Sequence, residues 1–105
     1  MALCHCLECQ KRTGAPFGVA AFFAETAVAV DGVSSEYRRM GDSGHEIEFH
    51  FCPTCGSSVY WRPHFRPGLV AVALGAFADP AFPAPSKAVY TERRHPWVAV
   101  DLGSE

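Results

Sequence analysis

Three cysteines lie within six positions near the start of the chain, in the segment CHCLEC of residues 4–9. One residue separates Cys4 from Cys6, and two residues separate Cys6 from Cys9. Thiolates are typical zinc ligands, and catalytic zinc sites keep one position open beside three protein ligands. Cysteines buried only for packing have no reason to cluster so closely. The segment therefore predicts a three-thiolate metal site with one position left for a substrate.

The same spacing constrains the backbone. In an extended strand, residues i and i+2 lie roughly 6.5 Å apart. Two sulfurs bound to one tetrahedral zinc are closer, at roughly 3.8 Å. We therefore expect the chain to bend at His5 and to continue into a short helix over residues 8–13, which brings Cys9 round to the other two sulfurs. Gly14 is expected to end this helix.

A second pair, Cys52 and Cys55, lies in the segment CPTCG. Two cysteines at this spacing with Gly56 directly after suit a tight turn whose N–H groups point at the sulfurs, as in structural zinc sites. A redox dithiol is the competing interpretation, but such motifs usually cap a helix, whereas here a turn and a strand are expected. The spacing permits all five cysteines on one zinc or a division over two metals, and two cysteines alone do not close a structural site.

Composition excludes several classes of protein. The 105 residues suit one domain, and 49% apolar and 19% charged residues argue against wholesale disorder. The net charge of −2 and the lack of a long basic run argue against nucleic-acid binding. No uncharged stretch is long enough to cross a bilayer, and no signal region precedes Cys4. We expect a cytoplasmic protein, where reduced thiols favour metal binding or catalysis over disulfides.

Short strands dominate the pattern. Residues 45–51 alternate, with Ile47, Phe49 and Phe51 on one face. Frequent Gly and Pro leave little room for helices, so we expect a mainly antiparallel β domain. Further strands are expected at residues 19–23, 28–30, 59–61, 69–74 and 97–100. Aromatic side chains expected in the core are Phe17, Phe22, Phe23, Phe77 and Phe82, of which Phe17 is the candidate for lining a pocket.

With these motifs placed, the sequence resembles the glutathione-dependent formaldehyde-activating enzyme family, also called the GFA or CENP-V domain. The resemblance runs in order over nearly the whole chain. It is carried by CHCLECQKRTG at residues 4–14, FG at 17–18, FHFCPTCG at 49–56, GAFADP at 75–80 and RHPW at 94–97.

The resemblance implies a Mss4-like fold of antiparallel β-sheets with zinc-binding loops and two zinc sites. Cys4, Cys6 and Cys9 match the catalytic site, and Cys52 and Cys55 match half of the structural one. Residues 1–105 then form a single domain that lacks the family's leading strands and first C-x-C pair. This leaves the second zinc site incomplete and the N-terminal sheet edge uncovered, and a second copy in a homodimer would cover that edge.

The ligand set favours sulfur chemistry. Zinc with three thiolates carries a net charge near −1 and stays thiophilic, so a substrate thiol suits the open position better than hydroxide. We expect a carbon–sulfur lyase of the S-(hydroxymethyl)glutathione synthase type, acting on glutathione and formaldehyde. A non-catalytic, zinc-stabilised binding module is the alternative. The residues expected to contact the substrate are Lys11, Arg12, Thr13, Gly14, Phe17, Arg94 and Trp97.

Overall fold

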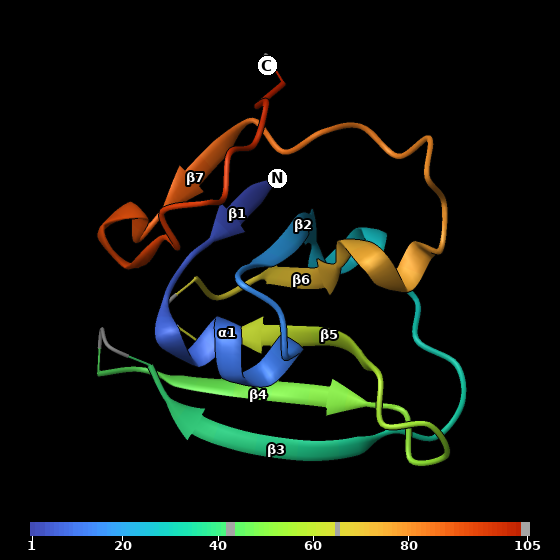
Figure 1. Cartoon of the computed structure of the whole chain (residues 1–105). Coiled ribbons are helices and arrows are strands. Elements are labelled where there is room, and N and C mark those ends of the chain that lie inside the picture. Colours follow the sequence, from blue (N-terminus) through green and yellow to red (C-terminus); the bar gives the residue numbers. More distant parts are fainter. Residues whose placement is uncertain (42–43, 65, 104–105) are drawn as a thin grey trace.

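A computed structural model describes residues 1–41, 44–64 and 66–103 (Figure 1). Within these ranges the chain forms one seven-stranded sheet, in the order β3-β4-β5-β6-β2-β1-β7, and one short α-helix. The strands are β1 (Ala2–Cys4), β2 (Gly18–Ala24), β3 (Ser35–Met40), β4 (Glu46–Phe51), β5 (Ser58–Pro63), β6 (Leu69–Ala73) and β7 (Lys87–Val89). The helices are α1 (Leu7–Thr13) and the 3-10 turns η1 (Glu25–Ala27), η2 (Leu74–Phe77) and η3 (Thr91–Arg93). The prediction of a mainly β fold with at most one short α-helix is confirmed.

The sheet is mixed, because β1 and β7 pair in parallel while the other described pairs are antiparallel. Figure 1 shows β7 running beside β1, after a long connection that follows η2. A parallel neighbour requires such a crossover. β1 therefore has a partner on each side, β2 and β7. The expectation of an uncovered N-terminal edge was wrong, and the sheet edges are β3 and β7.

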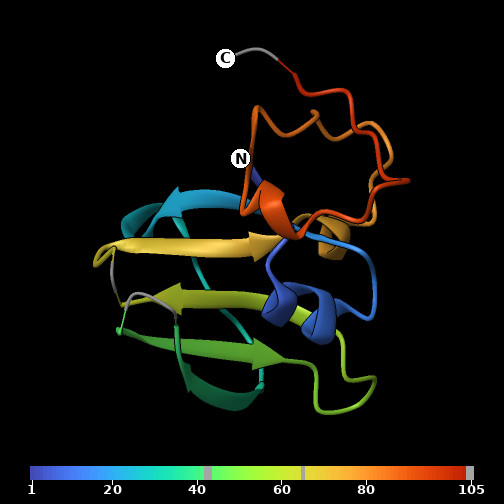
Figure 2. The same ribbon diagram turned by 60° about the vertical axis from the view of Figure 1, so that its left-hand side comes forward.

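The alternation predicted for residues 45–51 is confirmed in β4. Ile47 and Phe49 are buried on the side of the sheet that faces α1. Phe49 is the cross-strand neighbour of Trp61 in β5. The opposite face is polar, and Glu48 there pairs with Arg62. Both views place α1 over the middle of the sheet, near β4 and β5 (Figures 1 and 2). One face of β4 thus lies on the side of the sheet that carries the cavity, and the other face carries ion pairs.

Two expected strands are absent from the described fold. Residues 28–30 follow η1 without sheet pairing, and the Val28 N–H donates to Glu25 O at 3.2 Å. Residues 97–100 likewise follow a turn, in which the Val98 N–H donates to His95 O at 3.0 Å. β-branched residues fit a pleated surface but need a neighbouring strand to pair with. No helix in the three described ranges is long and apolar enough to span a membrane.

The core is built from small side chains, with Leu3 and Val70 as its largest fully buried members. The expectation that the five named phenylalanines fill it was wrong, since none of them is fully buried: Phe17 and Phe82 are half-buried, and the other three are exposed. Phe22, Phe23 and Phe77 are 40%, 36% and 41% exposed. The last two instead pack edge to face on each other, with ring centroids 6.4 Å apart, where η2 lies against β2.

Candidate metal centre and its cavity

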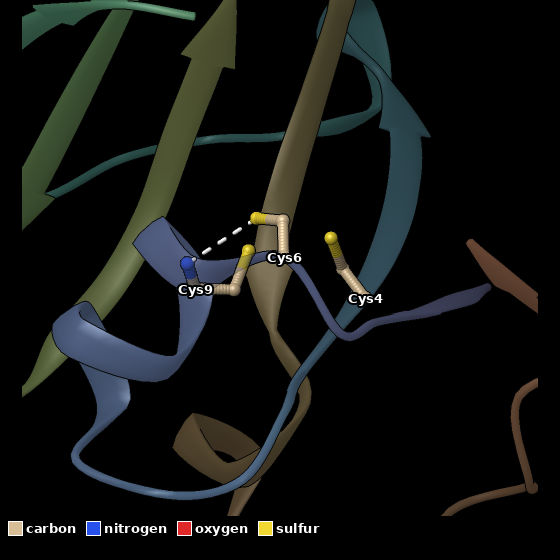
Figure 3. Close-up of side chains that lie close together, drawn as sticks. All are labelled: Cys4, Cys6 and Cys9. Carbon is tan, nitrogen blue, oxygen red and sulfur yellow. Dashed lines mark hydrogen bonds between the residues drawn. The ribbon is translucent and has the colours of Figure 1, made fainter. Parts of the chain in front are cut away.

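The sulfurs of Cys4, Cys6 and Cys9 all lie within 4.8 Å of one another. Figure 3 shows them gathered between the end of β1 and the first turn of α1. β1 ends at Cys4, and Cys6 is the N-cap of α1, where its Sγ accepts the Cys9 N–H at 3.3 Å. The helix ends at Gly14, which adopts φ +66° and donates its N–H to Gln10 O. The predicted bend at His5, the helix and its cap are therefore confirmed.

Gln10 fixes this loop to distant parts of the chain. Its Nε2 donates to His5 O at 2.9 Å and to Arg93 O at 3.1 Å, and its Oε1 lies 2.8 Å from His95 Nε2. The His5 N–H extends the pairing of β1 with β7 by donating to Val89 O at 3.1 Å. The His5 ring is buried, and that burial, with Arg94 and His95 nearby, lowers its pKa. These contacts hold the cysteine loop in place without using the sulfurs.

The three thiols do not titrate alike. A hydrogen bond from the Cys4 thiol, assisted by Cys6 and by the Arg12 guanidinium, lowers the pKa of Cys9 to about 5. The bond to Cys9 and burial raise the pKa of Cys4, and burial followed by the bond to Cys9 raises that of Cys6. These opposite pKa shifts favour a thiolate at Cys9, stabilised by hydrogen bonds from the thiols of Cys4 and Cys6. A divalent cation would take the place of the remaining thiol protons.

The sulfurs open onto a cavity of about 250 Å³. Its walls are mainly apolar and include Phe49 and Trp61, while Arg12 and Arg39 are its cations. A second hollow of about 410 Å³ shares Glu8, Arg12, Arg39 and Phe49 with the first and continues to Gly56. An apolar cavity with a few convergent polar groups is the usual form of a small-molecule site.

The second cysteine pair forms the expected tight turn. Gly56 has φ +79° and donates its N–H to Cys52 O at 2.8 Å, and the Cys52 N–H donates to Ser57 O at 2.9 Å. β5 begins directly afterwards, as expected of a knuckle rather than a helix-capping redox motif. The Ser57 hydroxyl, 3.2 Å from Cys55 Sγ, lowers the pKa of Cys55. Among the residues the structure describes, no third His, Cys, Asp or Glu joins this pair, and the pair does not join the first cluster.

The predicted substrate contacts divide into two groups. Lys11 and Arg12 line the hollows, although Lys11 is 74% exposed and pairs with Glu8 at 3.4 Å. Thr13 and Gly14 lie at the end of α1, where Thr13 Oγ1 donates to Cys9 O at 2.8 Å.

The other three predicted contacts, like Thr13 and Gly14, lie outside both hollows. Phe17 packs edge to face against His5, with ring centroids 5.9 Å apart. Arg94 donates to Val98 O. Trp97 is 72% exposed and lies against the His95 ring. The structure therefore brings only Arg12 of the whole predicted set directly against the cysteine cluster.

Arg39, Phe49 and Trp61 are site residues that the sequence patterns did not reveal. Alternation along β3 places Tyr37 and Arg39 on the side of α1, opposite Glu36 and Arg38. A polar segment such as SEYRRM offers little hydrophobic signal for that strand. Without the strand, its register against β4 and the position of Arg39 over Phe49 could not be predicted.

The sequence profile of one family, described as glutathione-dependent formaldehyde-activating enzyme, matches residues 1–93. The chain belongs to that family. The matched region includes both cysteine motifs and every residue that lines the two hollows. No curated protein matches the chain. The family is one of enzymes in glutathione-dependent formaldehyde activation, and in this GFA-family chain the cysteine cluster could hold a metal ion.

Zinc suits the donor set. Three soft sulfur donors within 4.8 Å of one another match the ligands of zinc in Cys-rich sites. In the described residues no fourth His, Cys, Asp or Glu belongs to this group. A three-donor set facing a cavity corresponds to a catalytic arrangement, whereas a fourth protein ligand would have indicated a closed structural site.

Proposed function

We propose that this GFA-family chain is a zinc-dependent carbon–sulfur lyase of the S-(hydroxymethyl)glutathione synthase type. It would add the glutathione thiol to formaldehyde and catalyse the reverse release. One observation carries the proposal: three sulfurs, with no fourth His, Cys, Asp or Glu beside them in the described part of the chain, face an apolar cavity of about 250 Å³. A purely structural zinc site has no need of such a cavity.

Cys4, Cys6 and Cys9 would hold the zinc ion. Bound there, zinc would supply a soft, thiophilic Lewis acid that favours the thiolate form of a substrate thiol near neutral pH. The Arg12 guanidinium stabilises negative charge on the cluster, as its effect on the Cys9 pKa indicates. The rings of Phe49 and Trp61 limit access of water to the substrate sulfur.

The reaction involves no oxidation. A carbon–sulfur bond forms between the thiol sulfur and the formaldehyde carbon, and the proton lost by sulfur ends on the former carbonyl oxygen. The reverse reaction breaks the same bond and returns the proton to sulfur. The cavity holds the two small reactants together, and positioning of this kind contributes much of the rate of a bimolecular addition.

For Cys52 and Cys55 we propose a separate metal-binding role as half of a second, structural zinc site. The supporting feature is the tight turn with Gly56 at φ +79°. Since the described residues offer no third ligand there, we expect the 105-residue chain to bind one zinc ion firmly, through the first cluster.

The test combines metal content with turnover. Zinc per chain is measured on reduced protein, and exchange between glutathione, formaldehyde and their adduct is followed by NMR exchange spectroscopy. Cys6→Ser should lower zinc content and abolish enzyme-dependent exchange, whereas Cys55→Ser should keep one zinc per chain and full exchange. Unchanged exchange in metal-free protein would overturn the mechanism. A zinc-loaded protein that accelerates no exchange would instead support the non-catalytic binding module.

A further inference from the structure

Two cationic side chains lie against the same aromatic ring in the cavity. The Arg12 guanidinium carbon is 5.6 Å from the centroid of Phe49, and that of Arg39 is 5.2 Å from it. Arg12 also lies 4.4 Å from the ring of Trp61. The two arginines come from different elements, α1 and β3. Two positive charges beside one buried ring favour binding of an anion near that ring.

Within the part of the chain that is described, no carboxylate forms an ion pair with either arginine. Among residues 1–41, 44–64 and 66–103, neither arginine has an Asp or Glu oxygen within 4.0 Å. Within the same ranges the Arg39 side chain makes a single long hydrogen bond, 3.4 Å, to Met40 O. The Nε of Arg12 is buried and has no hydrogen-bond partner among the described residues, and this side chain faces the Cys9 sulfur.

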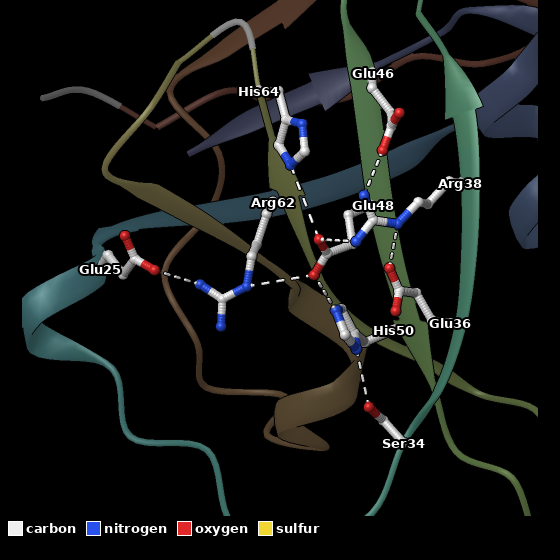
Figure 4. Close-up of polar contacts among 9 residues, drawn as sticks. All are labelled: Glu25, Ser34, Glu36, Arg38, Glu46, Glu48, His50, Arg62 and His64. Carbon is white, nitrogen blue, oxygen red and sulfur yellow. Dashed lines mark hydrogen bonds and ion pairs between the residues drawn. The ribbon is translucent and has the colours of Figure 1, made fainter.

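The polar face of the sheet provides an internal comparison. Arg38 bonds to Glu36, Glu46 and Glu48, and Arg62 bonds to Glu25 at 2.7 Å (Figure 4). The chain has 11 acidic residues, so a shortage of carboxylates does not explain the lack of partners on the cavity side. The arginines of the polar face are neutralised by carboxylates. On the cavity side Arg12 faces the Cys9 sulfur, and Arg39 has no acidic partner among the described residues, so its charge is available to a ligand in the cavity.

The location of the two arginines indicates the chemical class of the ligand that they would bind. Both line the cavity into which the sulfurs of the cysteine cluster open, and both also line the adjoining hollow. A ligand whose sulfur lies at the cysteines and that extends into the second hollow would contact residues that line both, among them Phe49 and the two arginines. Arginine presents a planar fork of donors that matches a carboxylate bidentately.

We propose that Arg39, together with Arg12, forms a carboxylate-binding subsite at Phe49 that selects acidic thiols as substrates. This inference rests on the proposed function and names its substrate class, thiols that carry a carboxylate at a distance from the sulfur. Glutathione, with two carboxylates, belongs to the class, and 2-mercaptoethanol does not. Arg39 is a specificity-determining residue in this proposal and takes no part in the bond changes.

Binding can be tested without turnover. S-methylglutathione keeps both carboxylates and blocks the sulfur, and a Trp97→Phe background leaves Trp61 as the only tryptophan. Titration of zinc-loaded protein, followed by Trp61 fluorescence, should give a Kd that Arg39→Met weakens by about 10-fold or more. Arg39→Lys should recover part of the loss. Arg66→Met, which removes an exposed charge outside both hollows, should leave Kd unchanged.

A ligand control avoids dependence on variant folding. The dimethyl ester of S-methylglutathione should bind the unsubstituted arginine pair at least about 10-fold more weakly than the free acid. Equal binding of ester and acid, or an unchanged Kd in a folded Arg39→Met protein, would overturn the subsite.

Turnover separates this inference from the proposed function. Arg39→Met should raise KM for glutathione about 10-fold with little change in kcat, while turnover of 2-mercaptoethanol with formaldehyde stays as before. If the protein turns over no thiol yet binds S-methylglutathione through Arg39, the function fails and the subsite stands. If it turns over glutathione and Arg39→Met changes neither KM nor Kd, the function stands and the subsite fails.

Discussion

Arg12 occupies the space that a side chain at Gly18 would need. A Cβ at Gly18 would lie 3.0 Å from Arg12 Nη2 and 3.4 Å from Cys9 Cβ. The bare backbone of β2 therefore lets α1 approach closely and leaves the guanidinium beside the Cys9 sulfur and over Trp61. The φ angle of Gly18 is not positive. The glycine is therefore explained by the lack of room for a side chain and not by its backbone conformation.

Gly18→Ala should push the Arg12 side chain away by a few tenths of an ångström while the protein stays folded, since the far end of a flexible side chain can move. With the guanidinium moved, the lowered pKa of Cys9 should rise. The measurement is the pH dependence of Cys9 alkylation in zinc-free protein, located by mass spectrometry. Gly75→Ala, where nothing lies within 4 Å of the new Cβ, is the matched control. An unchanged Cys9 profile would show that Arg12 stays in place.

Cys6 has two separable tasks, as a metal ligand and as the N-cap of α1. Serine can accept the Cys9 N–H but is a poor zinc ligand, and alanine can do neither. Both variants should lose zinc affinity by more than about 100-fold, because even supporting residues around a metal site cost 10–100-fold. In zinc-free protein only Cys6→Ala should be less stable, by about 1 kcal/mol. Chelator competition and urea unfolding measure the two effects, and equal stabilities of the zinc-free variants would contradict the capping role.

Gly14 ends α1 at φ +66°, a conformation that costs other L-residues energy. Gly14→Ala should lower the free energy of unfolding by about 1 kcal/mol. Gly14→Asn should cost less, because asparagine tolerates the left-handed region. Thermal unfolding of the three proteins gives the comparison. If alanine and asparagine destabilise equally, the cost arises from something other than φ.

Local signals in the sequence predicted local structure correctly. The spacing of Cys4, Cys6 and Cys9 required a bend, and Gly14 marked the end of a helix, because ligand geometry and capping each depend on a few neighbouring residues. The alternation of β4 was visible for the same reason, since one buried face imposes a period of two. The cysteine cluster of the candidate site could thus be found before any tertiary contact was known.

What could not be predicted depends on pairing between distant segments. The sequence of β3 is polar, and its stability comes from partners across the strand, such as Arg38 beside Glu48. Residues 28–30 have suitable side chains but no neighbouring strand. The meeting of Arg12 and Arg39 on Phe49 requires both the register of β3 on β4 and the position of α1, and neither is written in a local pattern. The cavity walls could therefore not be predicted, because they depend on the register between strands that are distant in sequence.

Glu48 holds together the ion pairs on the polar face of the sheet (Figure 4). Its side chain is 14% exposed and lies 2.5 Å from His50 Nε2, 2.9 Å from Arg38 Nη2 and 3.6 Å from Arg62 Nε. The hydrogen bond with His50, followed by the charges of Arg38, His50 and Arg62, lowers the pKa of Glu48 below its ordinary 4.5. A carboxylate with a lowered pKa stabilises the fold above its ordinary pKa, and this contribution is lost as the pH falls through the folded value.

Glu48→Gln should therefore lower the free energy of unfolding at pH 7 by about 1–3 kcal/mol, the range for hydrogen bonds to charged groups. The difference from the unsubstituted protein should persist down to about pH 4.5 and shrink at lower pH, as Glu48 itself becomes neutral. Urea unfolding from pH 7 to pH 3 measures it. Glu92→Gln removes the charge of an exposed side chain on η3 and should change stability by less than about 0.5 kcal/mol. A Glu48→Gln difference that stays constant down to pH 3 would mean that shape at this position, rather than charge, stabilises the sheet.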